Sequence, residues 1–478
     1  MAFSLTLLAG RGYCFTAILG HLPSRVVPTA KELRRAASTI SNLGNKGGSV
    51  PKSLVRVRVG IGVTALLALT LVAGLSTVQS GASTASVKAS TAGNTASAPG
   101  ITKTTIKIGI LSDLTGTASS SFATSPGAME ARFKAINAAG GINGRKIVWV
   151  VDDTQSTPAG AETAAKDLVQ NKGVFAVAEI SSAFYGAAPF LASEKVPVTG
   201  VALDGPEWYQ QPNTNLFSTT GNAAASGPAY GDGGFWKAIG ATKISYVESN
   251  VSAAINQGNS VYQSIAKDGL HSCDKTIVPL GSVNFTAFAL SFKADGCNAA
   301  ECACVLSSSL AMATALHQAG LNNVKIVFAA GPTNDIFQNA QDEAAAKNAY
   351  FPGIVSSPTY TNAASLAFLA ELKKYDPTYK GGLPDLGAGD GWPVANLMVE
   401  GLTQAGKNPT RASFITNLRK VTNWTDSGLA TGPINFVHFG QNPTTQCFSY
   451  VQFNGTKYVA FPKSGKSFCG AALPGTKT

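Results

Sequence analysis

The sequence predicts an α/β protein made of two Rossmann-like lobes with parallel sheets. Short β-rich runs alternate with helical stretches from residue 106 to residue 201, and a second alternating series runs from residue 243 to residue 329. The chain has 478 residues, which is more than a single hydrophobic core usually holds. This alternation favours parallel sheets with helices on both faces and right-handed crossovers.

The elements of the first series follow from hydrophobic periodicity. Expected strands are residues 106–111 (IKIGIL), 146–151 (KIVWVV), 174–178 and 196–201. Expected helices are residues 128–138, 159–170 and 183–193, the first of which spaces Met129, Phe133 and Ile136 at helical intervals.

The second series repeats this order. Expected strands are residues 243–248, 276–279, 303–306 and 325–329. Expected helices are residues 256–267, 285–294 and 310–320.

A leader precedes both series. Residues 50–80 combine basic residues, an apolar run at 59–75 and small residues, which is typical of a secretory signal, and the apolar run is also long enough for an uncleaved membrane anchor. Residues 1–49 do not fit a signal, and a translation start near Val50 would explain them. Residues 81–103 are rich in Ser, Thr and Ala, so we expect a spacer. The folded part is therefore expected outside the cytoplasm, secreted or attached to the cell envelope.

The positive charge does not indicate nucleic-acid binding. Residues 1–80 contain nine Lys or Arg and one acidic residue, so most of the net charge of +11 lies in the leader. The rest of the chain has 28 basic and 25 acidic residues, without a basic run that could follow a phosphate backbone.

Six of the seven cysteines follow residue 270, and an even number in an exported chain indicates disulfides. We expect Cys447 to pair with Cys469 across a hairpin-like stretch, with the other four linked among themselves. A metal site is not expected, because Cys302 and Cys304 are spaced too tightly for zinc and the histidines are far apart.

No motif supports catalysis or a cofactor. The Gly465-Lys466-Ser467 run lacks the first glycine of a phosphate-binding loop, and no Gly-x-Ser-x-Gly turn occurs. Asp152 and Asp153 are paired carboxylates, and one of them is expected to cap the helix after Thr157. We therefore expect a binding protein rather than an enzyme.

Ligands of open α/β sheets bind beyond the carboxyl ends of the strands. The corresponding loops are rich in Ser, Thr, Asn and Gly, whose hydroxyls and amides at helix starts suit an anion. These loops are residues 112–121, 152–157, 179–184, 202–208, 248–256 and 330–335.

Four motifs carry a resemblance to a known family. They are IKIGILSDLTG (106–116), INAAGGINGRKIVWVVDD (136–153), EISSAFYGAAPFLASEKVPVTG (179–200) and FSTTG (217–221). In their order, over about residues 104–460, the chain resembles the type I periplasmic binding proteins, in particular the branched-chain amino acid (leucine/isoleucine/valine) binding family of ABC importers.

The resemblance implies a Venus flytrap with ligand between two lobes joined by a three-crossing hinge. The crossings are expected near residues 217–222, 352–358 and 430–435. Lobe 1 would comprise residues 104–221 and 356–431, and lobe 2 residues 222–355 and 432–471. The implied partners are a small solute and an ABC permease in the cytoplasmic membrane, with the binding protein a monomer. A sensory receptor of the same fold is the alternative.

The resemblance also implies binding residues. Ser181 and Ser182 match the serines that hold a ligand carboxylate, and Ala202 matches a backbone contact. The second lobe departs from the family, with Asn250 in place of a Tyr-Gly pair and Thr333 in place of the acid that pairs a ligand ammonium. Asp335 could substitute for that acid, so the expected solute is an amino acid, an amide or a carboxylate-like compound.

Five further residues are candidates for the cleft, each with a structural alternative. Asp113 could instead brace its loop, and the two serines could simply cap a helix. Phe184, Tyr185 and Trp208 are either cleft walls or packing residues. Trp392 lies where the family often has an aromatic residue that starts a helix, and it belongs either to the cleft or to the core on the hinge side.

Overall fold

The computed structural model describes residues 3–9, 13–19, 93–203, 205–208, 210–220, 231–232, 234–353, 359, 361–437 and 445–473. The chain divides into two compact units, Met1–Ser83 and Thr84–Thr478. In the first unit, β1 (Phe3–Ala9) and β2 (Tyr13–Leu19) pair in antiparallel fashion. The expected signal or anchor at residues 50–80 lies outside the described residues. Among the helices that are described, none has the length and apolarity needed to span a bilayer.

The first sheet of the second unit has five parallel strands in the order β4-β3-β5-β6-β7. They are β3 (Thr105–Ser112), β4 (Lys146–Asp153), β5 (Ala176–Ile180), β6 (Val198–Gly200) and β7 (Leu216–Ser218). Residues of β3 alternate between two cores: Ile106, Ile108 and Ile110 face one, and Leu111 faces the other. This alternation follows from the two-residue repeat of a strand that is covered on both faces.

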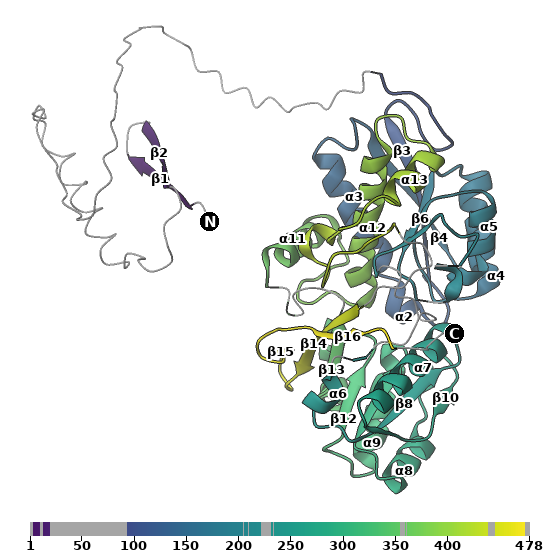
Figure 1. Ribbon diagram of the computed structural model, residues 1–478, viewed down its shortest axis with the longest axis vertical. Coiled ribbons are helices and arrows are strands. Elements are labelled where there is room, and N and C mark those ends of the chain that lie inside the picture. Colours follow the sequence, from purple (N-terminus) through teal and green to yellow (C-terminus); the bar gives the residue numbers. More distant parts are fainter. Residues whose placement is uncertain are drawn as a thin grey trace, which may run out of the picture. The chain divides into compact units, whose positions relative to one another are not determined.

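Helices from distant parts of the chain cover this sheet, as Figure 1 shows. One side carries α3 (Ser125–Ala138), α12 (Leu386–Ala405) and α13 (Arg411–Leu418), and the other carries α4 (Pro158–Lys166) and α5 (Ala188–Ser193). The close packing of α12 on α3 needs a glycine, because a Cβ on Gly391 would lie 2.6 Å from the carbonyl oxygen of Ser125. The lobe also contains the helix α11 (Ala363–Tyr375). Its short elements are α2 (Ser119–Phe122), the π-turn η1 (Asp167–Asn171) and the 3₁₀ turns η2 (Phe184–Gly186), η3 (Pro206–Trp208) and η5 (Asp426–Gly428).

The second sheet is mixed and contains nine strands within the described residues. Its parallel strands are β8 (Lys243–Ser249), β9 (His271–Ser272), β10 (Thr276–Val278), β11 (Ala299–Ala303), β12 (Lys325–Phe328) and β13 (Tyr350–Gly353). An antiparallel extension follows, with β14 (Thr445–Phe453), β15 (Tyr458–Phe461) and β16 (Phe468–Ala471). Its helices are α6 (Phe235–Ala238), α7 (Ser252–Lys267), α8 (Thr286–Ala294), α9 (Leu306–Gln318), α10 (Ala340–Ala346) and the 3₁₀ turn η4 (Asn334–Gln338).

One predicted strand is wrong in position. β11 spans Ala299–Ala303 instead of residues 303–306, because α9 already begins at Leu306. The alanine-rich run has little intrinsic preference for a strand, but it lies buried between β8 and β12, where packing decides the conformation.

Residues 93–103 differ from the expected spacer, since they pack on the first lobe. Ile101 belongs to its core. The buried guanidinium of Arg145 donates to the carbonyl oxygens of Thr95 at 2.9 Å and Thr102 at 2.7 Å. The composition of residues 93–103 did not predict this packing, because the segment is held by a few specific contacts and not by a large buried apolar area.

The third crossing also lies later than expected. Ile434 pairs with Trp424, and Phe436 is buried in the first core, so the chain stays with the first lobe through residue 436. The connection to β14 falls in residues 438–444, outside the described part. Of the other two expected crossings, residues 221–222 and 354–358 lie outside the described part as well.

Three disulfides tie the second lobe. Cys447 and Cys469 face each other on β14 and β16, which confirms the expected pair. The other four cysteines form Cys273–Cys297 and Cys302–Cys304, so they are linked among themselves as expected.

Candidate functional site

The carboxyl ends of β3 and β5 bring two predicted loops together. Ser112 is opposite Ile180 in the parallel register, so Asp113 and Ser181 follow neighbouring strand ends. Ligands of such sheets bind at this edge. We call the loops that follow β3, β5 and β6 the sheet-end site.

A buried carboxylate organises the sheet-end site. Oδ1 of Asp113 accepts hydrogen bonds from the Ser181 hydroxyl at 2.6 Å and from the Thr154 hydroxyl. Oδ2 accepts from the amide and the hydroxyl of Ser182, at 2.9 and 2.8 Å. Asp113, Ser181 and Thr154 are fully buried, whereas Ser182 is partly exposed. The serines therefore donate to the protein's own carboxylate, which holds three loops in one arrangement.

Thr154 was not among the predicted binding residues. It follows β4, the strand next to β3, and the polar loop at residues 152–157 was the signal that could have identified it. Its role was hidden because its partner is a side chain 41 positions away in sequence.

Ala202 lies next to the start of the first crossing. Its backbone amide donates to the hydroxyl of Ser218 at 3.1 Å, and that hydroxyl is 2.8 Å from the hydroxyl of Thr220. Thr219, between them, has a buried hydroxyl with no hydrogen-bond partner among the described residues. This free hydroxyl is a second polar group that sequence reasoning did not single out.

Three of the four predicted aromatic residues are buried. The rings of Phe184 and Trp208 lie 5.1 Å apart within an apolar cluster. Trp392 donates from Nε1 to Oε2 of Glu371 at 2.7 Å, so it takes the core position that was its alternative. Tyr185 is 42% exposed.

The predicted residues of the second lobe follow β8 and β12. Asn250 is exposed, and its backbone N–H donates to the carbonyl oxygen of Val278 at 2.7 Å. Thr333 is buried, and its hydroxyl accepts from the amide of Asp335 at 3.1 Å as the N-cap of η4. The hydroxyl of Tyr458 accepts from the Thr333 amide at 3.1 Å and donates to its carbonyl at 2.7 Å. The backbone of Thr333 is thus already engaged.

Two more polar groups mark the end of β8. The Ser249 hydroxyl is buried and has no hydrogen-bond partner in the part of the chain that the structure describes. Glu248 is fully buried, forms a 2.8 Å ion pair with Lys275, and has a pKa raised mainly by burial. Asn250 was predicted from this loop, while the free hydroxyl one residue earlier was missed.

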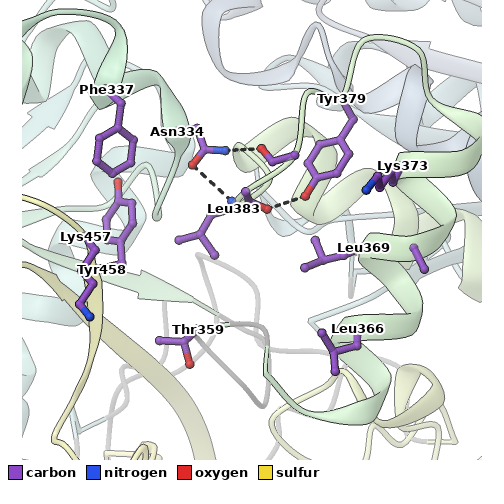
Figure 2. Close-up of a pocket in the computed structure, with 13 residues that line it drawn as sticks. Asn334, Phe337, Thr359, Leu366, Leu369, Lys373, Tyr379, Leu383, Lys457 and Tyr458 are labelled. Atoms are coloured by element: carbon purple, nitrogen blue, oxygen red, sulfur yellow. Dashed lines mark hydrogen bonds between the residues drawn. The ribbon is translucent and has the colours of Figure 1, made fainter.

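A cavity of about 660 Å³ lies elsewhere, between η4 and β15 on one wall and α11 with the loop after it on the other. In Figure 2, Phe337 and Tyr458 lie on one wall, and Leu369, Lys373 and Tyr379 lie opposite. We call it the flank pocket, and its lining consists of Asn334, Phe337, Thr359, Leu366, Leu369, Ala370, Lys373, Tyr379, Gly381, Gly382, Leu383, Lys457 and Tyr458. The lining includes none of the predicted binding residues.

The comparison with known families decides the assignment of the fold. The sequence description of a periplasmic binding protein family matches residues 105–457, well over half of the chain. The chain belongs to this periplasmic binding protein family. The resemblance inferred from the sequence motifs is therefore confirmed, together with the α/β flytrap fold. No relative among curated protein sequences matches significantly.

Solved structures share the fold of this periplasmic binding protein. A fatty acid ABC transporter substrate-binding protein from Thermomonospora curvata has 18% identity and a TM-score of 0.64, covering 80% of this chain and 96% of its own. A solute-binding protein from R. palustris in complex with benzoate has 17% identity and a TM-score of 0.64, covering 78% and 98%. A branched-chain amino acid binding protein from Streptococcus pneumoniae in complex with isoleucine has 20% identity and a TM-score of 0.61, covering 74% and 97%.

The periplasmic binding protein thus brings some predicted residues together and separates others. Asp113, Ser181 and Ser182 form one bonded group, and Thr333 and Asp335 form another. Trp392 lies apart from both, in the cluster around α11 and α12. Within the described residues, no group of three or more His, Cys, Asp or Glu side chains could hold a metal ion.

Proposed function

We propose that this protein captures a small polar organic solute outside the cytoplasmic membrane and presents it to an ABC permease. The family match over residues 105–457 is the observation that carries the proposal. Three similar structures are described as binding proteins of ABC transporters or branched-chain amino acid transporters, one with benzoate and one with isoleucine. Both of these ligands have a carboxylate. An amino acid, an amide or a carboxylate-like compound is the corresponding proposal for this chain, which we take to act as a monomer.

The sheet-end site is the proposed docking surface. Ser182 is its best-placed side chain, because it is partly exposed and lies at the strand end. Its hydroxyl donates to Asp113, so it would accept a hydrogen bond from a solute N–H or O–H, and it would have to rotate away from Asp113 to donate to a solute carboxylate. Preorganised polar groups lose little conformational entropy on binding. Solute docks on the first lobe, and contacts with the second lobe that form only on closure shift the population toward the closed state.

The second lobe favours solutes without an ammonium group. Thr333 has a neutral side chain, and its hydroxyl caps η4. Asp335 follows, with its carboxylate accepting from Gln338 at 3.0 Å. A buried ammonium without a carboxylate partner is costly. Benzoate-like and aliphatic carboxylates are therefore preferred over leucine in this proposal.

Calorimetric titration of the purified protein with isoleucine, benzoate, benzamide and decanoate tests the proposal. At least one should bind, and Ser182→Ala should weaken its binding by about tenfold or more, equivalent to about 1.4 kcal/mol. Ser193→Ala is the matched control, since this exposed serine donates only to a nearby carbonyl at 2.8 Å.

Stability must be measured alongside binding, because Ser181 and Ser182 donate to a buried carboxylate. Replacing both with alanine would lower the melting temperature even without ligand, so the single Ser182→Ala variant is the cleaner test. If Ser182→Ala binds the solute as tightly as the parent protein does, the sheet-end site is not the docking surface. Chemical conversion of a bound solute by the pure protein would contradict a binding function.

A further inference from the structure

We propose that the flank pocket is a second binding site, which takes an organic carboxylate with an apolar body. Its lining comes from η4 and β15 on one side and from α11 and the following loop on the other. None of these elements contributes to the sheet-end site. The cavity of about 660 Å³ has the size of a site for a small organic molecule.

The apolar part of the pocket suits a hydrocarbon or aromatic body. Phe337 is 38% exposed and Leu366 is 55% exposed, although both are large apolar side chains. The Phe337 ring already packs edge-on against Phe453 at 5.4 Å and Tyr458 at 6.0 Å, so one wall is a rigid aromatic surface. Covering exposed apolar area with an apolar ligand is favourable.

The charged part of the pocket suits an anion. Lys373 and Lys457 contribute ammonium groups from opposite walls, and the described lining includes no acidic side chain. Neither ammonium group has an ion pair or a hydrogen bond with any described residue, whereas those of Lys172 and Lys275 have acidic partners. Lysine pairs with a carboxylate as a point charge, so the anion need not be planar.

The two walls are already linked by one side chain. Asn334 donates from Nδ2 to the carbonyl oxygen of Gly381 at 2.7 Å and accepts from the amide of Leu383 at 3.3 Å (Figure 2). A ligand whose carboxylate pairs with one of these lysines while its apolar body contacts the opposite wall would add a second link beside it. Occupancy would therefore stabilise the arrangement in which η4 and the loop after α11 are in contact.

The test uses 2-naphthoate and its uncharged counterpart 2-naphthamide, titrated calorimetrically into the purified protein. 2-Naphthoate should bind, and 2-naphthamide should bind at least about tenfold more weakly. The variant Lys373→Met/Lys457→Met, which keeps most of the side-chain volume, should weaken 2-naphthoate by about tenfold or more. Ala370→Trp, at an exposed lining position, should fill the pocket and abolish binding.

Two controls separate this site from the sheet-end site. Lys374→Met/Lys463→Met removes two exposed lysines outside the lining and should leave binding of 2-naphthoate unchanged. Ser182→Ala should also leave the binding event that depends on Lys373 and Lys457 unchanged, even if the proposed transport ligand no longer binds. The inference is overturned if 2-naphthoate binds no tighter than about 1 mM, if the Lys373/Lys457 variant binds normally, or if all binding disappears in Ser182→Ala.

Discussion

The hydroxyl of Ser181 donates a 2.6 Å hydrogen bond to Oδ1 of Asp113, and both residues are fully buried. The bond joins the loop after β5 to the loop after β3. Moving either loop would leave a buried polar group without its partner, which is costly. The edge of the first sheet is therefore a preformed surface in the absence of ligand.

Replacing Asp113 tests how much this bond network stabilises the first lobe. Asp113→Ala removes the acceptor of the hydroxyls of Thr154, Ser181 and Ser182, and should lower the free energy of unfolding by about 3 kcal/mol. Urea titration measures the change. Asp274→Ala, at an exposed position, is the control and should stay within about 0.5 kcal/mol of the parent. An unchanged urea midpoint for Asp113→Ala would show that the network contributes no stability.

Glu301 should make the second lobe less stable as pH rises. It is 7% exposed, and burial, with a smaller effect from Asp232, raises its pKa from 4.5 to about 8. Between these two values the folded state holds a proton that the unfolded state releases, so the unfolding free energy falls with increasing pH.

Glu301→Gln should remove this dependence. Its melting temperature should exceed that of the parent at about pH 9 and lose that advantage at about pH 5. Glu162→Gln, an exposed acid in a 2.7 Å pair with Lys166, should leave the slope unchanged. Parallel pH profiles for the parent and Glu301→Gln would contradict the assignment.

Arg145 should hold residues 93–103 on the first lobe. Arg145→Met leaves the carbonyls of Thr95 and Thr102 without their buried donor, so hydrogen exchange in residues 93–103 should accelerate by about tenfold or more. Lys103→Met, at an exposed position in the same segment, serves as the control. Exchange that is equally slow in both variants would mean that the apolar contacts of Ile101 suffice.

The Cys447–Cys469 disulfide should stabilise the antiparallel extension. The cysteines are 22 residues apart in sequence, and a loop of this length corresponds to about 3 kcal/mol of chain entropy. Cys447→Ser/Cys469→Ser should lose about that much stability in urea, while Thr456→Ala, at an exposed position between the cysteines, should lose far less. Peptide mapping without reductant should yield three linked pairs, and any other pairing would refute the arrangement.

Much of the fold was predictable because its signals are local. The runs at residues 106–111 and 146–151 are rich in β-branched and apolar residues, and they form β3 and β4 with nearly the predicted bounds. The strand at 303–306 was misplaced because the true strand is rich in alanine and owes its conformation to its two neighbours. The antiparallel extension of the second sheet was predicted only as a hairpin-like stretch between two cysteines.

The candidate site was predictable in position but not in chemistry. Strand ends alone placed Asp113, Ser181 and Ser182 at one edge, and the structure joins them. Phe184 follows β5 and Trp208 follows β6, yet both rings are buried against each other. This could not be predicted, because a loop sequence does not reveal the direction of a side chain.

The sequence by itself determined the alternating α/β pattern, the family and the loops that meet at the carboxyl edge of the first sheet, since each depends on neighbours along the chain. Only the tertiary structure decided that Asp113 accepts hydrogen bonds from the hydroxyls of Ser181 and Ser182, and that Arg145 anchors residues 93–103. It also decided that Lys373 and Lys457, 84 positions apart, line one cavity. These features join residues that are distant in sequence, and their geometry exists only after the sheets and helices have packed.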